Sequence, residues 1–226
     1  SKPKTKVEEH HHDHHDESFI TKYIFSEDHK VIAKQFLITG IFWAIIGGAM
    51  SSLFRIQLGF PDMDLTALSP IIGNWLTPQG KIDPEVYLAL ITMHGTIMVF
   101  FVLTAGLSGT FSNYLIPLQI GARDMASGFL NMLSYWFFFL SSIVMFISIF
   151  VEGGPASGGW TIYPPLSALP QAVSGSGMGM TLWLVSMSLF IVSALLGALN
   201  YITTVINLRT EGMTFFRMPL TIWAFF

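Results

Sequence analysis

Four long stretches of the chain contain no Asp, Glu, Lys or Arg, and this spacing constrains the fold more than any other feature. The stretches are residues 35–54, 86–122, 125–151 and 153–208. A helix that crosses about 30 Å of hydrocarbon, rising about 1.5 Å per residue, needs about 20 apolar residues. Each stretch is long enough, and 52% of the 226 residues are hydrophobic while only 11% are charged. The sequence therefore predicts a multi-pass membrane protein.

The last uncharged stretch is predicted to hold both a loop and a helix. Gly, Pro and Ser are concentrated in residues 153–179, which favours a long connection and places the fourth span at about residues 180–207. A fifth span is predicted to begin at residues 220–226, where Pro219 suits the first helical turn. The apolar runs lack the ten-residue alternation of barrel strands. The predicted fold class is all-α: a transmembrane helix bundle with four full spans and the start of a fifth, interpreted as the front part of a longer protein.

The chain divides by composition into a polar segment, residues 1–30, and a membrane domain, residues 31–226. Five closely spaced histidines at positions 10–15 predict a solvated tail that is able to bind Cu, Ni or Zn ions. Nine Lys and Arg residues fall on the amino-terminal side of the predicted spans and two on the opposite side. This asymmetry predicts a cytoplasmic amino terminus.

The rest of the composition excludes several function classes. The net charge of −3 provides no basic face, so we exclude binding to nucleic acid. Without cysteine, any metal or cofactor must be held by His, Met, carboxylate or backbone groups.

His94 lies in the middle of an apolar run, next to Gly95. A histidine inside a bilayer needs a partner that offsets its desolvation, which makes it a candidate functional residue. It is either an axial ligand of a haem or a metal, or a side chain hydrogen-bonded across a helix interface. A second ligand must come from elsewhere, because no other histidine is predicted to lie in a span.

Polar residues recur at helical spacing near the predicted cytoplasmic side. Asp124, Asn131 and Ser134 are predicted to share one face of the third helix. The fourth helix carries a matching stripe with a seven-residue spacing: Ser186, Ser193, Asn200 and Asn207. Asn113, near the same end of the second helix, could complete the set. Such groups can hold ordered water that conducts protons from a carboxylate at its mouth. Helix capping by Asp124 and packing by the other residues is an equal alternative.

Three residues are predicted to lie on the opposite, non-cytoplasmic side. Arg55 is expected to close the first span, either as an interfacial anchor or as a donor to a buried carbonyl or an anionic cofactor group. Trp160 and Tyr163 are typical of an interfacial aromatic belt.

Seven segments together carry a resemblance to a known family. They are residues 28–30 (DHK), 54–59 (FRIQLG), 93–98 (MHGTIM), 113–125 (NYLIPLQIGARDM), 131–136 (NMLSYW), 159–167 (GWTIYPPLS) and 200–209 (NYITTVINLR). Over about residues 25–226 the chain resembles the amino-terminal part of subunit I of the haem-copper terminal oxidases of the aa3 type, a twelve-helix protein.

The resemblance implies roles for individual residues. His94 matches the axial ligand of the low-spin haem a, Arg55 the arginine that hydrogen-bonds its formyl group, and Trp160 and Tyr163 the residues near its propionates. Asp124 matches the mouth of the D-type proton channel. The residues matching the rest of that channel are Asn113, Asn131, Asn200, Ser134 and Ser193.

The function implied is that of a proton-pumping cytochrome c oxidase, which passes electrons through haem a to haem a3 and copper B and reduces dioxygen to water. The implied partners are subunits II and III, cytochrome c, dioxygen, protons and a wider respiratory supercomplex, in the cytoplasmic membrane of a bacterium. The ligands of haem a3 and copper B are expected beyond Phe226, so these residues alone are predicted to be inactive.

Two departures and two alternatives accompany this interpretation. Ser127-Gly-Phe129 follows Asp124 where the family commonly has Phe-Pro, and Ala198 stands where serine is common. A quinol oxidase of the same superfamily would share these helices. A proton-coupled transporter using His94 and Asp124 is the alternative from another class, although the sequence lacks the broken helices and inverted repeats that would favour it.

Overall fold

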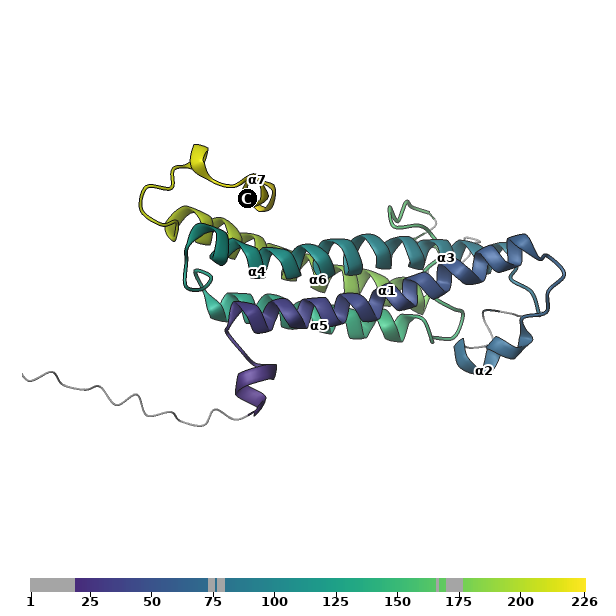
Figure 1. Ribbon diagram of the computed structural model, residues 1–226. Helices are drawn as coiled ribbons and strands as arrows, with labels where there is room; N and C mark the ends of the chain where they lie inside the picture. The colour runs from purple at the N-terminus through teal and green to yellow at the C-terminus, as the bar shows by residue number, and fades with distance from the viewer. Residues whose placement is uncertain (1–18, 73–75, 77–79, 166, 170–176) are drawn as a thin grey trace, which may run out of the picture.

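The computed structural model describes residues 19–72, 76, 80–165, 167–169 and 177–226 (Figure 1). The predicted histidine-rich tail lies outside these residues. The described part of the chain is helical and contains no strand. Four helices are long and apolar enough to cross a membrane: His29–Gly59 (α1), Pro84–Ile120, Gly128–Ser148 (α5) and Met178–Asn207 (α6). They confirm the predicted all-α, four-span architecture. Leu220–Phe225 (α7) is a short helix at the place where the fifth span is predicted to begin.

The second span is built from three consecutive helical pieces. These are Pro84–Thr96 (α3), a π-helix at Ile97–Ser108 (η3) and Gly109–Ile120 (α4). The Thr104 hydroxyl donates to the carbonyl of Val99, five residues earlier, over 2.8 Å. Because π-helical turns are wider than α-helical ones and often mark functional sites, this region is a natural place to look for one. The short elements elsewhere are Ile20–Ile24 (η1), Thr66–Leu68 (η2), Ser69–Ile72 (α2) and Phe215–Arg217 (η4).

The first helix is longer than the uncharged stretch that predicted it. It begins at His29, because an Asp28 carboxylate oxygen accepts hydrogen bonds from Lys30 N at 2.7 Å and Val31 N at 3.1 Å and so caps the helix. It continues past Arg55 to Gly59. Gaps between charges mark the segment suited to hydrocarbon, whereas caps decide where a helix begins.

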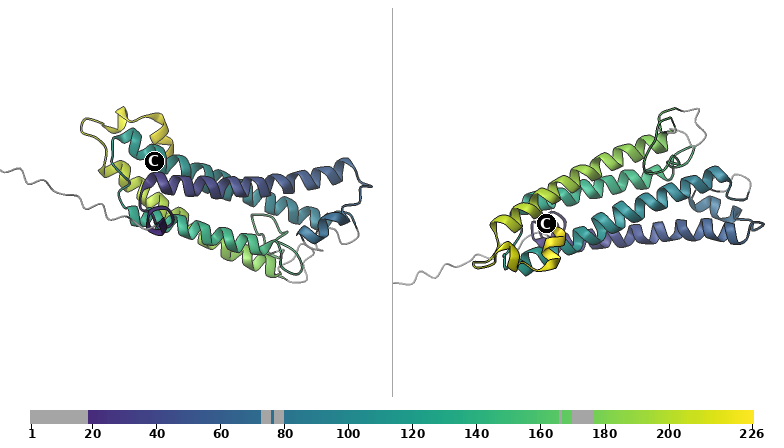
Figure 2. Two further views of the ribbon diagram at one scale, coloured as in Figure 1. Left: turned by 60° about the horizontal axis from the view of Figure 1, so that its bottom comes forward. Right: turned by 90° about the horizontal axis from the view of Figure 1, so that it is seen from above.

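The four spans form two antiparallel pairs, visible as two layers in Figure 2. One pair is α5 with α6, and the other is α1 with the second span. The start of α1, the end of α4, the start of α5, the end of α6 and α7 gather at one end of the bundle (Figure 1). We call this the amino-terminal end. The connections that follow α1 and α5 lie at the opposite end.

Glycines allow α1 to approach the second span closely. A Cβ atom built on Gly40 would lie 2.7 Å from the Cα atom of Gly106. One built on Gly47 would lie 2.8 Å from Met98 Sδ, and one built on Gly109 would lie 2.9 Å from the Phe36 ring. Small residues permit such backbone contact between membrane helices, where packing rather than the hydrophobic effect holds helices together.

We expect Gly40→Ala to destabilise the bundle by about 1–3 kcal/mol, the usual cost of overpacking. The reason is that the added methyl meets the backbone of Gly106, which cannot rotate away. Gly48→Ala is the matched control, since a Cβ there meets nothing within 4 Å and the same helix gains propensity. Thermal unfolding of the detergent-solubilised full-length protein would measure both; equal melting temperatures would contradict the close contact.

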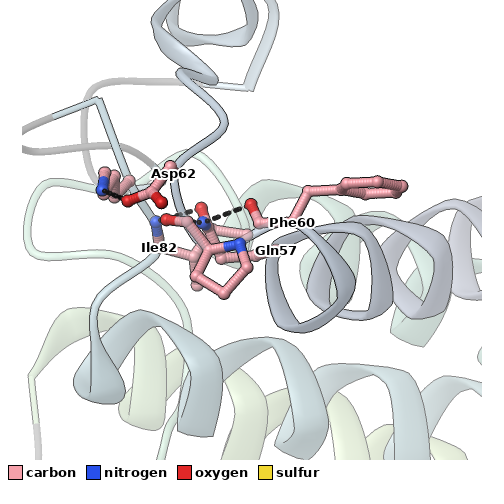
Figure 3. A network of polar contacts seen from close by, with 6 residues as sticks. Gln57, Phe60, Asp62 and Ile82 are labelled. Carbon is pink, nitrogen blue, oxygen red and sulfur yellow. Dashed lines mark hydrogen bonds and ion pairs between the residues drawn. The ribbon is translucent and has the colours of Figure 1, made fainter.

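A polar network holds the connection after α1 against the end of that helix (Figure 3). The Gln57 amide donates to Pro61 O at 3.1 Å and accepts from Ile82 N at 3.0 Å. Lys81 forms an ion pair with Asp62 at 3.1 Å. In the same connection, hydrogen bonds from the hydroxyl and the backbone amide of Thr66 lower the pKa of Asp64. Gln57 and the Lys81–Asp62 pair therefore hold the two ends of residues 60–83 to each other.

Candidate functional site

His94 lies in the last turn of α3, immediately before the π-helix. Its Nδ1 atom is 2.8 Å from the carbonyl oxygen of Gly47 on α1. A carbonyl only accepts hydrogen bonds, so Nδ1 carries a proton, and in the neutral imidazole Nε2 then presents its lone pair. The ring meets Phe54 edge to face, with centroids 5.7 Å apart. The imidazole is thus oriented by α1 and has one nitrogen ready to bind a metal.

The surroundings of His94 suit a porphyrin better than a bare ion. A Cβ on the adjacent Gly95 would meet nothing within 4 Å, so this side of the helix is open. The neighbouring core is aromatic and includes Phe54 and Phe101. Within the described ranges there is no group of three or more His, Cys, Asp or Glu that could hold a metal ion. The residues therefore fit a haem with His94 as one axial ligand.

The residues predicted to accompany the haem lie toward the end of the bundle opposite the amino-terminal end. The sequence predicts that Arg55 closes the first span. In the structure it lies one helical turn before the end of α1 and is exposed. The correction follows from the helix continuing to Gly59. Trp160 packs against Phe100 with ring centroids 5.5 Å apart and is 49% exposed, and Tyr163 is 69% exposed. In the described part of the chain, no hydrogen bond joins Arg55 to His94 or to either aromatic residue.

Three asparagines from three spans are buried at the amino-terminal end. Asn113, Asn131 and Asn200 are at most 1% exposed. Asn200 binds the connection between α4 and α5 with both ends of its amide: Oδ1 accepts from Ser127 N at 3.0 Å, and Nδ2 donates to Ser127 O at 3.1 Å. The Thr204 hydroxyl accepts from Ala126 N at 2.8 Å. Helix α6 therefore fixes the connection that carries Asp124.

Asp124 lies in this connection and not on the third span, contrary to the predicted helical face. Helix α5 begins at Gly128, and Ser127 is its cap, with Oγ accepting from Leu130 N at 3.2 Å. A serine at this position satisfies the first free amides of the helix, which removes the alternative that Asp124 caps it. Among the described residues, the Asp124 carboxylate accepts only from Met125 N, at 2.7 Å, and Asp124 is half-buried. Part of its surface is therefore open to solvent.

Three buried polar atoms in the asparagine cluster have no hydrogen-bond partner in the part of the chain that the structure describes. Asn113 Nδ2 donates to Gly109 O at 2.7 Å and to the Tyr201 hydroxyl at 3.0 Å, but its Oδ1 is unpartnered. Asn131 has neither its amide nitrogen nor its amide oxygen paired. A buried polar group without a partner is costly, and ordered water is its usual remedy. The cluster is therefore suited to hold water.

A pocket of about 170 Å³ lies next to the cluster, between the second span and α6. Its polar lining comes from three spans and consists of Thr104, Ser108, Ser134, Ser193 and Tyr201. The Ser193 hydroxyl donates to Ser134 O, and the Ser134 hydroxyl donates to Asn131 O, each over 2.7 Å. The volume is enough for several water molecules.

The predicted polar stripe on α6 divides into different roles. Ser193 and Asn200 join the pocket and the cluster, as the spacing suggested. Ser186 instead exchanges hydrogen bonds of 2.7 Å with Ser141 on α5, each hydroxyl donating to the other residue's carbonyl, which is helix packing. Asn207 is exposed. Ser186, Ser193 and Asn200 therefore all face α5 or its cap, and only Asn207, the last residue of α6, leaves that face.

Sequence reasoning missed two residues of the cluster. His29 is 3% exposed, and its Nδ1 lies 2.8 Å from the carbonyl oxygen of Asn113. The Tyr201 hydroxyl contacts the Asn113 side chain. The cap at Asp28 could have placed His29 at the start of a helix, but nothing in the sequence indicated that either residue meets Asn113.

Fold and site together define a multi-pass membrane protein with an oriented intramembrane histidine and a buried polar cluster at one end. The family described as Cytochrome C and Quinol oxidase polypeptide I matches residues 31–226. The chain belongs to this family, the subunit I family of the haem-copper oxidases.

Curated relatives agree with this assignment. The chain is 45% identical over 213 residues to the alternative cytochrome c oxidase subunit 1 of Bradyrhizobium diazoefficiens, covering 94% of this chain and 33% of that protein. It is 38% identical to cytochrome c oxidase subunit 1 of Synechocystis, covering 89% of this chain and 32% of the relative. It is 35% identical to the heme-copper oxidase subunit I+III of Aeropyrum pernix, covering 92% of this chain and 23% of that protein. The chain thus spans about a third of the first two relatives and less of the third.

Proposed function

We propose that this chain forms the part of a proton-pumping cytochrome c oxidase subunit I that holds the low-spin haem and admits protons through a D-type channel. His94 binds the haem iron through Nε2, and Arg55, Trp160 and Tyr163 lie toward the formyl and propionate groups. Asp124 collects protons from the cytoplasm. Asn113, Asn131 and Asn200 with Ser134 and Ser193 hold the water that carries these protons inward.

One observation supports the proposal more than any other. The hydrogen bond between His94 Nδ1 and Gly47 O orients the ring inside an apolar span, and it leaves Nε2 of the neutral imidazole free to donate its lone pair to iron. When bound, haem a supplies one-electron transfer, and haem a3 with copper B in the whole subunit supplies the reduction of dioxygen to water. The residues of this chain orient the imidazole, keep the haem environment apolar and conduct protons at a distance from it.

The proposal extends to partners and location. Subunits II and III, cytochrome c as electron donor and a respiratory supercomplex are its expected partners, in the cytoplasmic membrane of a bacterium with the amino terminus in the cytoplasm. The family description includes quinol oxidases, but the relatives compared above that name a substrate name cytochrome c. Membership in an oxidase family argues against an unrelated transporter.

A reduced-minus-oxidised visible spectrum of the purified full complex tests the proposal. We expect the bands of low-spin haem a together with a second haem whose bands shift when carbon monoxide is added. Oxidation of reduced cytochrome c, compared with oxidation of a quinol, then identifies the electron donor. A complex without any haem bands would refute the proposed function.

A further inference from the structure

Tyr201 links Asn113 to the pocket described above, as the Ser134 hydroxyl links the pocket to the backbone of Asn131. Its hydroxyl oxygen accepts from Asn113 Nδ2 at 3.0 Å. Its side chain also lines the pocket that contains Ser134 and Ser193. The ring lies along α6 over Gly197, where a Cβ would be 3.8 Å from the hydroxyl oxygen. A single residue thus reaches from the asparagine cluster to the pocket.

The hydrogen-bond inventory of Asn113 shows what this contact does. A side-chain amide has two N–H donors, and here one serves the carbonyl of Gly109 and the other the hydroxyl of Tyr201. Both donors are therefore used, and the unpartnered Oδ1 is turned away from them. Because its oxygen accepts from Asn113, the Tyr201 hydroxyl keeps its own hydrogen for another acceptor, either the neighbouring Ser112 side chain or water in the pocket.

We propose that Tyr201 is a positioning residue for proton uptake, whose hydroxyl orients Asn113 and couples it to water in the pocket lined by Ser134 and Ser193. This inference rests on the proposed function, because it assigns Tyr201 to the proton path that begins at Asp124. The hydroxyl holds the Asn113 amide so that Oδ1 accepts from one water molecule, and it anchors a second water on the pocket side. The phenol itself keeps its proton throughout.

The test is Tyr201→Phe in the full oxidase complex, because this change removes only the hydroxyl. We expect turnover and the rate of proton uptake to fall about five-fold, the effect of losing one neutral hydrogen bond, with the haem spectrum unchanged. Tyr114→Phe is the matched control: Tyr114 lies on the same span as Asn113 but is 43% exposed and does not line the pocket. Its turnover should equal that of the wild type.

A double variant separates positioning from simple packing. If Tyr201 acts through Asn113, then Asn113→Ala combined with Tyr201→Phe is no slower than Asn113→Ala alone, because the contact is already lost. If the slowing caused by Asn113→Ala and that caused by Tyr201→Phe multiply in the double variant, Tyr201 acts independently of Asn113. If Tyr201→Phe alone turns over like the wild type, Tyr201 has no role. Either result overturns the inference.

Measuring Asp124→Asn in parallel distinguishes this inference from the function on which it rests. Slow Asp124→Asn with normal Tyr201→Phe refutes Tyr201 alone. If Asp124→Asn turns over normally, while Tyr201→Phe is slow and adds nothing to Asn113→Ala, the role of Tyr201 stands and Asp124 is not the mouth of the path. If both variants turn over normally, the proton path and the inference fail together.

Discussion

Replacing His94 with Ala is expected to remove the low-spin haem signal completely from the purified complex and to abolish turnover. In the proposed function the imidazole supplies an axial ligand of the low-spin haem, and alanine would leave the iron without it. The bundle should still assemble, because the change costs the hydrogen bond to Gly47 O, about 1 kcal/mol. Visible spectroscopy and a haem determination on the full complex measure the loss.

His29→Asn provides the matched control for the spectrum. His29 is the other histidine among the described residues, and it is buried against the carbonyl of Asn113 rather than beside an open space. Asparagine can keep a donor toward that carbonyl. The low-spin haem bands should survive in this variant. A normal low-spin spectrum in His94→Ala would show that the ligand is another residue.

The spans were predictable because bilayer thickness and the cost of burying charge act on the sequence directly. An apolar, uncharged stretch of about 20 residues is long enough to cross the bilayer, and a helix satisfies its backbone hydrogen bonds there. The polar residues Asn113, Asn131 and Asn200 could be identified for the same reason, since each is conspicuous in an apolar run. Their burial at one end of the bundle followed from the antiparallel order of the spans.

What the sequence did not predict depends on contacts between distant residues or on competition between local ones. Ser127 caps α5 and leaves Asp124 before the helix, whereas the sequence pattern suggested only Asp124 as a cap. The π-helix at Ile97–Ser108 changes which residues of the second span face α1, and an apolar run gives no signal for it. The meeting of Tyr201 with Asn113 spans 88 residues and arises only from helix packing.

Asp124→Asn is expected to slow turnover and proton uptake by about a hundred-fold, the lower end of the range for a side chain that transfers protons. Asparagine has the same shape and keeps an oxygen that accepts from Met125 N, so the connection held by Asn200 and Thr204 stays in place. What is lost is the charge and the ability to take up a proton. The haem spectrum should therefore be unchanged, in contrast to His94→Ala.

Asp62→Asn tests whether position, rather than loss of a carboxylate, matters. Asp62 also lies in a connection between spans, but at the opposite end of the bundle, in an exposed ion pair with Lys81. Exposed pairs contribute about 0–1 kcal/mol, so neither stability nor turnover should change much. Since both substitutions remove one negative charge, a slow Asp124→Asn beside a normal Asp62→Asn would assign proton entry to the amino-terminal end. Equal rates in the two variants would remove Asp124 from the path and leave the asparagine cluster without its proton source.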